Sequence, residues 1–514
     1  MKMLKKALCM VLALITAFSC CVVAVGAQED TYDHLPQVFV TGLGSAKIYY
    51  EDDPEQKSLF YPFEFDRFID NLANVDDYIV KSIKNREPNI LRSVLYNYLM
   101  DCFGMLAFTP ECESMEGVTV EPTVLSYDGD GKYTFYYDSR QAPTVIAPQL
   151  NDYIHLVMEE TGSDKIELVG SSYGANAVTA FLYEFPEEYH HIDTLLLCVP
   201  SVGGMRFLGE LIAGNFTINP LGLCDFISNM VDAQLIPDFL YIMEEADILD
   251  VFLEAMLVPV LRESVYAAVI DVAREAVATL PALWVCVPDE NFEDAMINMY
   301  GENYQDPNHT YAKLIKEMTH YHYDVANRAA EIYTNAVETS DMEIAIITKF
   351  GSPAIPLTSG ETIMDDSLVT VPVSSFGATC VNYGEKLPED YVQQRYPEYD
   401  FMCPEWNIDA STGVLPFTTW YIKGLGHAKK NEDYKKFVDE IIYKDLTVFT
   451  DPNRPQFLDV SEEDPEKLVP LTVEEEKETL YDKFFAALKK LILLPKMIIE
   501  KIKSKIPAFL LKKK

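Results

Sequence analysis

The residues most capable of chemistry in this chain form a short segment, Gly170-Ser171-Ser172-Tyr173-Gly174. A strand-like run, Ile166–Val169, precedes this segment, and a helix-favouring run, Ala175–Ala180, follows it. A serine between two glycines at a strand-to-helix junction is typical of a nucleophile elbow, in which a strained turn lifts the hydroxyl above the sheet edge. Glycine removes side chains that would clash where strand and helix approach. The segment therefore predicts Ser172 as a nucleophile.

A serine hydroxyl is a weak nucleophile at neutral pH, so it requires a base within hydrogen-bond reach and an acid that orients the base. Beside a nucleophile elbow, the chain order is serine, acid, histidine. Asp366 follows a strand-like run at residues 344–348 and suits the acid position, with its neighbour Asp365 as the alternative. His427, in a glycine-flanked turn, is the only one of the eight histidines that comes after Asp366. We therefore predict a triad of Ser172, Asp366 and His427.

Attack on a carbonyl carbon creates an oxyanion, which requires hydrogen-bond donors that are already in place. The first donor is expected to be the backbone N–H of Tyr173, directly after the nucleophile. A glycine-rich loop, Gly42-Leu43-Gly44, follows a strand-like run that begins at Pro36, and it is expected to supply the second donor. We assign this donor to Leu43, with Gly44 as the alternative.

Strand-like runs alternate with helical patterns along much of the chain, which predicts an α/β fold with a mostly parallel central sheet. A long, mostly helical stretch interrupts the alternation, so we expect an inserted helical cap. The expected organisation is a signal peptide at 1–27, a first part of the core at 28–204, the cap at 205–340, a second part of the core at 341–445, an acidic linker at 446–479 and a basic amphipathic tail at 480–514.

Several segments of this chain resemble lecithin–cholesterol acyltransferase-like lipases of the α/β-hydrolase superfamily. They are Pro36–Ser45, Phe135–Arg140, Ile166–Gly174, Leu280–Trp284 and Val371–Ser375. Ser139 departs from this family's Tyr-Asp-Trp-Arg pattern, where the family has tryptophan. The acid segment, Asp-Asp-Ser-Leu-Val from Asp365, departs from the family's Gly-Asp-Gly-Thr-Val.

The resemblance implies an α/β-hydrolase fold and cleavage of carboxylic esters through an acyl-Ser172 intermediate, with water or an alcohol as the acceptor. Lipid or phospholipid esters are the expected substrates, because a cap of apolar helices suits a hydrophobic acyl chain. No cofactor or metal ion is expected. Two alternatives remain open: a catalytically inactive scaffold that binds the cell envelope, and an amidase or peptidase on the same fold.

The N-terminus has the pattern of a targeting segment. Lys2, Lys5 and Lys6 form a basic start, and Ala7–Ala27 carries no charge. Small residues precede Gln28, which favours cleavage there and export of the mature protein, either secreted or associated with the cell envelope. A retained membrane anchor is the alternative. Cys20 would allow lipid attachment, but the residues before it lack the aliphatic side chain that this modification requires.

Charge is distributed unevenly along the chain, which has a net charge of −40. From residue 480 onward there are ten lysines against two acidic residues, so the body of the protein is strongly acidic. Such a body disfavours nucleic-acid binding. The apolar residues of the tail recur at helical spacing, which predicts an amphipathic segment that lies on an anionic membrane. Docking of the tail on the acidic body and a frayed end are the alternatives.

Seven cysteines lie beyond residue 27, at spacings that fit no metal site. Cys102 and Cys112 could close a short loop, but we favour unpaired thiols. The segment Asp128-Gly129-Asp130-Gly131 lacks the full spacing of a calcium loop and predicts a hairpin turn instead.

Overall fold

The computed structural model describes residues 34–53, 58–59, 88–215, 217–230, 235–245, 249, 264, 266–358, 363–444 and 446–473. The predicted signal peptide at 1–27 and basic tail at 480–514 lie outside these residues. Within them, no helix is both long and apolar enough to cross a membrane. Six cysteines in the described ranges are free thiols: Cys112, Cys198, Cys224, Cys286, Cys380 and Cys403.

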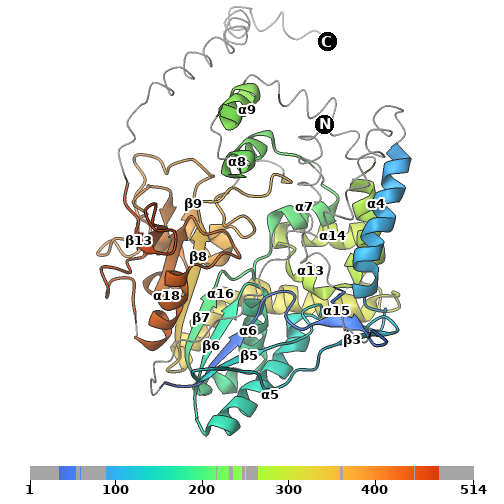
Figure 1. Cartoon of the computed structure of the whole chain (residues 1–514), viewed down its shortest axis with the longest axis horizontal. Coiled ribbons are helices and arrows are strands. Elements are labelled where there is room, and N and C mark those ends of the chain that lie inside the picture. Colours follow the sequence, from blue (N-terminus) through green and yellow to red (C-terminus); the bar gives the residue numbers. More distant parts are fainter. Residues whose placement is uncertain are drawn as a thin grey trace, which may run out of the picture.

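A large, mostly parallel sheet forms the centre of the molecule, which confirms the predicted α/β class (Figure 1). Among the described residues it has nine strands, and the antiparallel pairs are β4 with β5 and β12 with β13 at its two edges. Across the sheet the strands are β13 (Leu468–Pro470), β12 (Phe457–Val460), β11 (Thr419–Lys423), β8 (Glu343–Phe350), β7 (Ile192–Cys198), β6 (Ile166–Ser171), β1 (Gln37–Val40), β5 (Lys132–Phe135) and β4 (Tyr127–Gly129). Four short strands form two separate ribbons, β2 (Ile48–Tyr50) with β3 (Val118–Val120) and β9 (Thr379–Cys380) with β10 (Ile408–Asp409).

Helices connect the strands of this sheet. Their bounds are α4 (Pro88–Phe103), α5 (Pro143–Thr161), α6 (Tyr173–Glu184), α7 (Arg206–Ala213), α8 (Pro220–Met230), α9 (Leu235–Glu245), α12 (Ala267–Glu275), α13 (Pro281–Val285), α14 (Asp289–Tyr300), α15 (Ala312–His320), α16 (Ala329–Thr339), α17 (Val371–Ser374) and α18 (Glu432–Tyr443). The turn at Asp128–Gly131 joins β4 to β5, with positive φ at Asp130 and Gly131, so the predicted hairpin is confirmed.

Both faces of the sheet are buried. On β7, Leu195 and Leu197 join the core formed with α5, α6 and α16, whereas Leu196 and Cys198 join the core formed with α18. Side chains alternate between the two faces of a strand, so a strand covered on both faces is apolar at nearly every position. This requirement explains the continuous apolar run of β7.

A helical insertion, α7 to α15, lies between β7 and β8, and α4 packs with it in a core of its own (Figure 1). Leu91, Leu95 and Leu99 on α4 belong to this core together with Trp284 and Phe292. The expected cap at 205–340 differs from this arrangement in two respects. Helix α4 comes from the first part of the chain, and α16 packs on the sheet. The sequence alone does not show that α4 packs against the insertion or that α16 packs against the sheet, because both packings depend on contacts between segments that are distant in the chain.

An acidic linker was predicted at 446–479, but residues 457–470 within it contribute two strands to the central sheet. Residues 457–460 form β12, which pairs in parallel with β11, and residues 468–470 form β13 at the sheet edge. Phe457 and Leu458 are buried against the sheet. Arg454, just before β12, binds Asp433 and Glu440 of α18. Strand pairing, buried apolar residues and these ion pairs therefore join this charged segment to the fold.

Glu167 on β6 generates a prediction about stability. Its side chain is buried, and Oε2 accepts the N–H of Thr194 at 3.0 Å. Burial, assisted by the charge of Asp193, raises the pKa of Glu167 from 4.5 to about 7. The folded state therefore holds a proton that the unfolded chain releases, so this contribution to stability is full below pH 4.5 and is lost as the pH rises through 7.

We expect Glu167→Gln to match the wild type near pH 4.5 and to be more stable at pH 8, by on the order of 3 kcal/mol. Denaturant unfolding at the two pH values measures this difference. Glu159→Gln, on the exposed face of α5, is the control and should show no such pH-dependent gain. Equal stability of Glu167→Gln and wild type at pH 8 would contradict the assignment.

Candidate active site

Ser172 occupies a strained turn between β6 and α6. Its backbone has φ 53° and ψ −121°, a conformation that costs energy for a residue with a side chain. The Ser172 N–H donates to the carbonyl of Cys198 on β7 at 2.9 Å, which fixes the turn to the sheet. A Cβ atom on Gly174 would lie 2.2 Å from the carbonyl oxygen of Val40, so only glycine fits there. The predicted elbow geometry is present.

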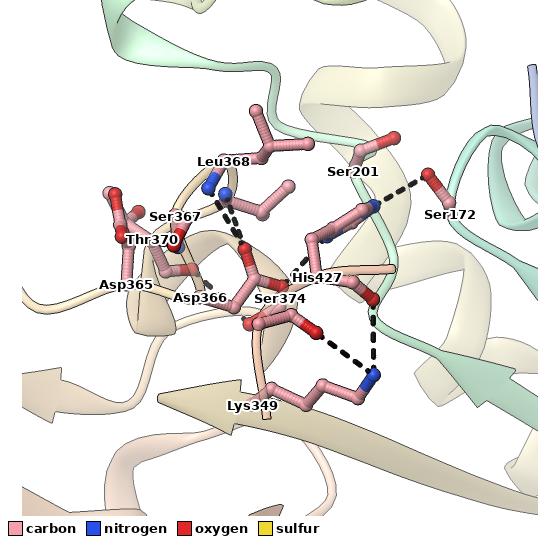
Figure 2. Close-up of polar contacts among 12 residues, drawn as sticks. Ser172, Ser201, Lys349, Asp365, Asp366, Ser367, Leu368, Thr370, Ser374 and His427 are labelled. Carbon is pink, nitrogen blue, oxygen red and sulfur yellow. Dashed lines mark hydrogen bonds and ion pairs between the residues drawn. The ribbon is translucent and has the colours of Figure 1, made fainter. Parts of the chain in front are cut away.

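The structure brings the three predicted triad residues together (Figure 2). Nε2 of His427 lies 2.8 Å from Oγ of Ser172, and Nδ1 lies 2.7 Å from Oδ2 of Asp366. As a carboxylate, Asp366 can only accept hydrogen bonds, so Nδ1 must carry the proton. Nε2 is then free to accept the proton of the serine hydroxyl. This arrangement can generate a serine nucleophile and return its proton to a leaving group.

Asp366, and not its neighbour Asp365, contacts His427. Asp366 is fully buried, and its Oδ1 accepts the N–H groups of Leu368 at 3.1 Å and Val369 at 2.8 Å. Oδ1 of Asp365 instead accepts the N–H of Ser367 at 2.7 Å. Burial, with the charge of Asp366, raises the pKa of Asp365 well above its ordinary value. Asp366 is therefore the carboxylate that is placed to orient the ring of His427.

The predicted oxyanion donors lie beside the nucleophile. A Cβ atom on Gly42 would lie 3.5 Å from Cβ of Ser172, so the glycine-rich loop flanks this serine. Gly44 donates its N–H to Oγ of Ser139 at 2.9 Å and is not available. In the described part of the chain, the N–H groups of Leu43 and Tyr173 have no hydrogen-bond partner. The geometry thus favours Leu43 over Gly44 as the second oxyanion donor and is consistent with Tyr173 as the first.

The segment Phe135–Arg140 supports this loop. Oη of Tyr137 donates to the carbonyl of Thr41 at 2.6 Å, and Ser139 holds Gly44 as described above. The buried guanidinium of Arg140 binds both carboxylate oxygens of Asp138 at 2.9 and 2.8 Å. Sequence reasoning identified this segment only by resemblance and assigned no role to Ser139. The role becomes visible only when β1 and β5 pair and bring the two loops together.

Sequence reasoning also missed Lys349, which lies on β8 beneath the loop that carries His427 (Figure 2). A lysine near the end of a strand gives no signal of burial, because most lysines are exposed.

Among the described residues, no group of three or more histidine, cysteine, aspartate or glutamate side chains is arranged to hold a metal ion. No protein-family model matches the chain, and no curated protein matches it.

The elbow generates a second prediction about stability. Gly174→Ala places a methyl group against the backbone of β1, which cannot move without disturbing the sheet. We expect a loss of roughly 1–3 kcal/mol or more, typical of overpacking, measured by denaturant unfolding. Gly162→Ala, at the end of α5 with open space around it, is the control and should cost only about 1 kcal/mol for its positive φ. An unchanged midpoint for Gly174→Ala would refute the close approach.

Proposed function

We propose that this protein is an exported serine hydrolase of the α/β-hydrolase fold that cleaves carboxylic esters, with lipid esters as the substrate class. The observation that carries the proposal is the hydrogen-bonded chain from Asp366 through His427 to Ser172, at a strained turn between a parallel strand and a helix. Three residues far apart in sequence meet in the geometry that acyl transfer requires. The order of these residues along the chain and the glycine-rich loop beside them add support.

In the proposed reaction, Oγ of Ser172 attacks the ester carbonyl carbon while Nε2 of His427 takes the hydroxyl proton. The carbonyl oxygen becomes an oxyanion, which the N–H groups of Leu43 and Tyr173 stabilise. Asp366 stabilises the imidazolium through Nδ1. When the tetrahedral intermediate collapses, His427 gives its proton to the departing alcohol, and the acyl group remains on Ser172.

Deacylation repeats these steps with a new acceptor. His427 takes a proton from water, or from an alcohol in O-acyl transfer, and the resulting oxygen attacks the acyl-Ser172 carbonyl. The proton then returns to Oγ of Ser172 as the acyl group leaves. No step requires a redox change. Each proton passes between His427 and Ser172, the departing alcohol or the acceptor.

The apolar helical insertion supports a hydrophobic acyl chain as the group that reaches Ser172. Its own core accounts for many of its apolar residues, so the support comes from its position in the chain: it follows the carboxyl end of β7, which lies in the sheet between β6 and β8, the strands that precede Ser172 and Asp366. The basic and apolar N-terminus supports export, and the lysine-rich tail supports contact with an anionic envelope surface.

A fluorophosphonate probe tests the nucleophile directly. We expect the probe to label the wild-type protein on Ser172 and the Ser172→Ala variant not at all, as measured by mass spectrometry of the intact protein and its peptides. A panel of carboxylic esters, phospholipids and amides, with Ser172→Ala as the control, then defines the substrate. A folded wild-type protein that resists labelling, or equal labelling of both proteins, would favour the inactive scaffold.

Exchange of each acidic residue separately tests the assignment of the orienting acid. We expect Asp366→Asn to lower kcat by about 10³–10⁴-fold, because an amide at this position favours the wrong tautomer of His427. Asp365→Asn keeps a side chain of the same shape at a position that does not contact the His427 ring, so it should stay within a few-fold of the wild type. The reverse ranking of the two variants in a steady-state ester assay would assign the role to Asp365.

A further inference from the structure

A buried lysine supports the loop that carries the general base. Lys349 lies near the end of β8, where its side chain is 1% exposed. The residues from Gly424 to Asn431 link β11 to α18 and pass over this end of β8. In Figure 2 the Lys349 side chain extends from its strand toward the backbone of His427.

All three hydrogens of the Lys349 ammonium group have acceptors in this one loop. Nζ donates to the carbonyl oxygens of Gly426 at 3.3 Å, His427 at 3.0 Å and Lys429 at 2.6 Å. Nζ also lies 4.7 Å from the centre of the Tyr434 ring, a favourable position for a cation. A buried ammonium is costly unless it is hydrogen-bonded, so these contacts fix the loop relative to the strand.

The backbone of His427 is thereby held on both sides. Its N–H donates to the carbonyl of Asp366 at 2.8 Å, and its own carbonyl accepts from Lys349. These two contacts connect the histidine to the acid loop and to β8. The ring must reach Ser172 and Asp366 at the same time, so a shift of its backbone would lengthen at least one of the two hydrogen bonds.

We propose that Lys349 is a positioning residue for the general base, holding the His427 loop by its three carbonyl contacts. This inference rests on the proposed function, because it assigns His427 as the base. Lys349 itself touches no reacting atom. Its effect passes through the backbone of residues 426–429.

Three substitutions of Lys349 separate the loss of its hydrogen-bond donors from the loss of its charge. Lys349→Met removes the donors and the charge, Lys349→Gln keeps up to two N–H donors without the charge, and Lys349→Arg keeps both donors and charge. Lys132→Met is the matched control, because Lys132 lies on β5 and pairs with Asp439, without contact to the His427 loop. Thermal unfolding of each variant establishes that it is folded before activity is compared.

We expect Lys349→Met to lower kcat by about tenfold or more with KM within twofold, since near-attack geometry is lost and ground-state binding is kept. Lys349→Gln and Lys349→Arg should recover part of kcat. If Lys349→Met fails to fold, the Gln and Arg variants provide the same comparison. Wild-type kcat and KM in folded Lys349→Met would overturn the proposal.

A spectroscopic measurement separates this inference from the proposed function. The Nδ1–H proton of His427, hydrogen-bonded to Asp366, gives a downfield proton resonance that requires no turnover and is assigned by its loss in Asp366→Asn. We expect the resonance to broaden or disappear in Lys349→Met and to remain in Lys132→Met. An inactive wild type that shows this pattern would contradict ester hydrolysis but leave the positioning role intact. An unchanged resonance in folded Lys349→Met would contradict the positioning role.

Discussion

The burial of Asp366 is the constraint on which the rest of the site depends. A carboxylate with no exposure to water must have all its charge satisfied by protein donors, and here the loop N–H groups of Leu368 and Val369 and the ring of His427 supply them. Removing any of these donors would leave a buried charge without compensation. The same contacts that make the acid tolerable in the interior also fix the tautomer and the direction of the imidazole.

The parallel sheet places these groups at one edge without bringing their sequences together. Ser172 follows β6, Asp366 lies beyond β8, and His427 lies beyond β11. Parallel strands present their carboxyl ends at the same side of a sheet, so each loop that follows a strand reaches the same region. Both faces of the sheet are buried, and hydrogen bonds of 2.7 and 2.8 Å join the three separate loops above its edge.

Local patterns were sufficient to predict the elbow, the α/β class and the three residues that meet at the site. Ser172 was identified by glycine spacing at a strand-to-helix junction, and His427 by its position late in the chain. Interactions between distant segments could not be predicted in this way. The paired strands β12 and β13 were mistaken for part of a linker because their charged surroundings hide a few buried residues. Lys349 and Ser139 were missed because their roles depend on which loops the folded sheet brings against them.

The placement of the helical insertion has a consequence for the synthesis of this protein. β7 pairs with β6 on one side and with β8 on the other, yet β7 ends at Cys198 and β8 begins at Glu343. The chain is made from its N-terminus, so β7 is synthesised before β8. The edge of β7 that pairs with β8 therefore stays open until the whole insertion has been made. An unpaired apolar strand edge is prone to aggregate. The nascent protein therefore passes through a stage in which one edge of β7 still lacks the strand that pairs with it in the finished sheet.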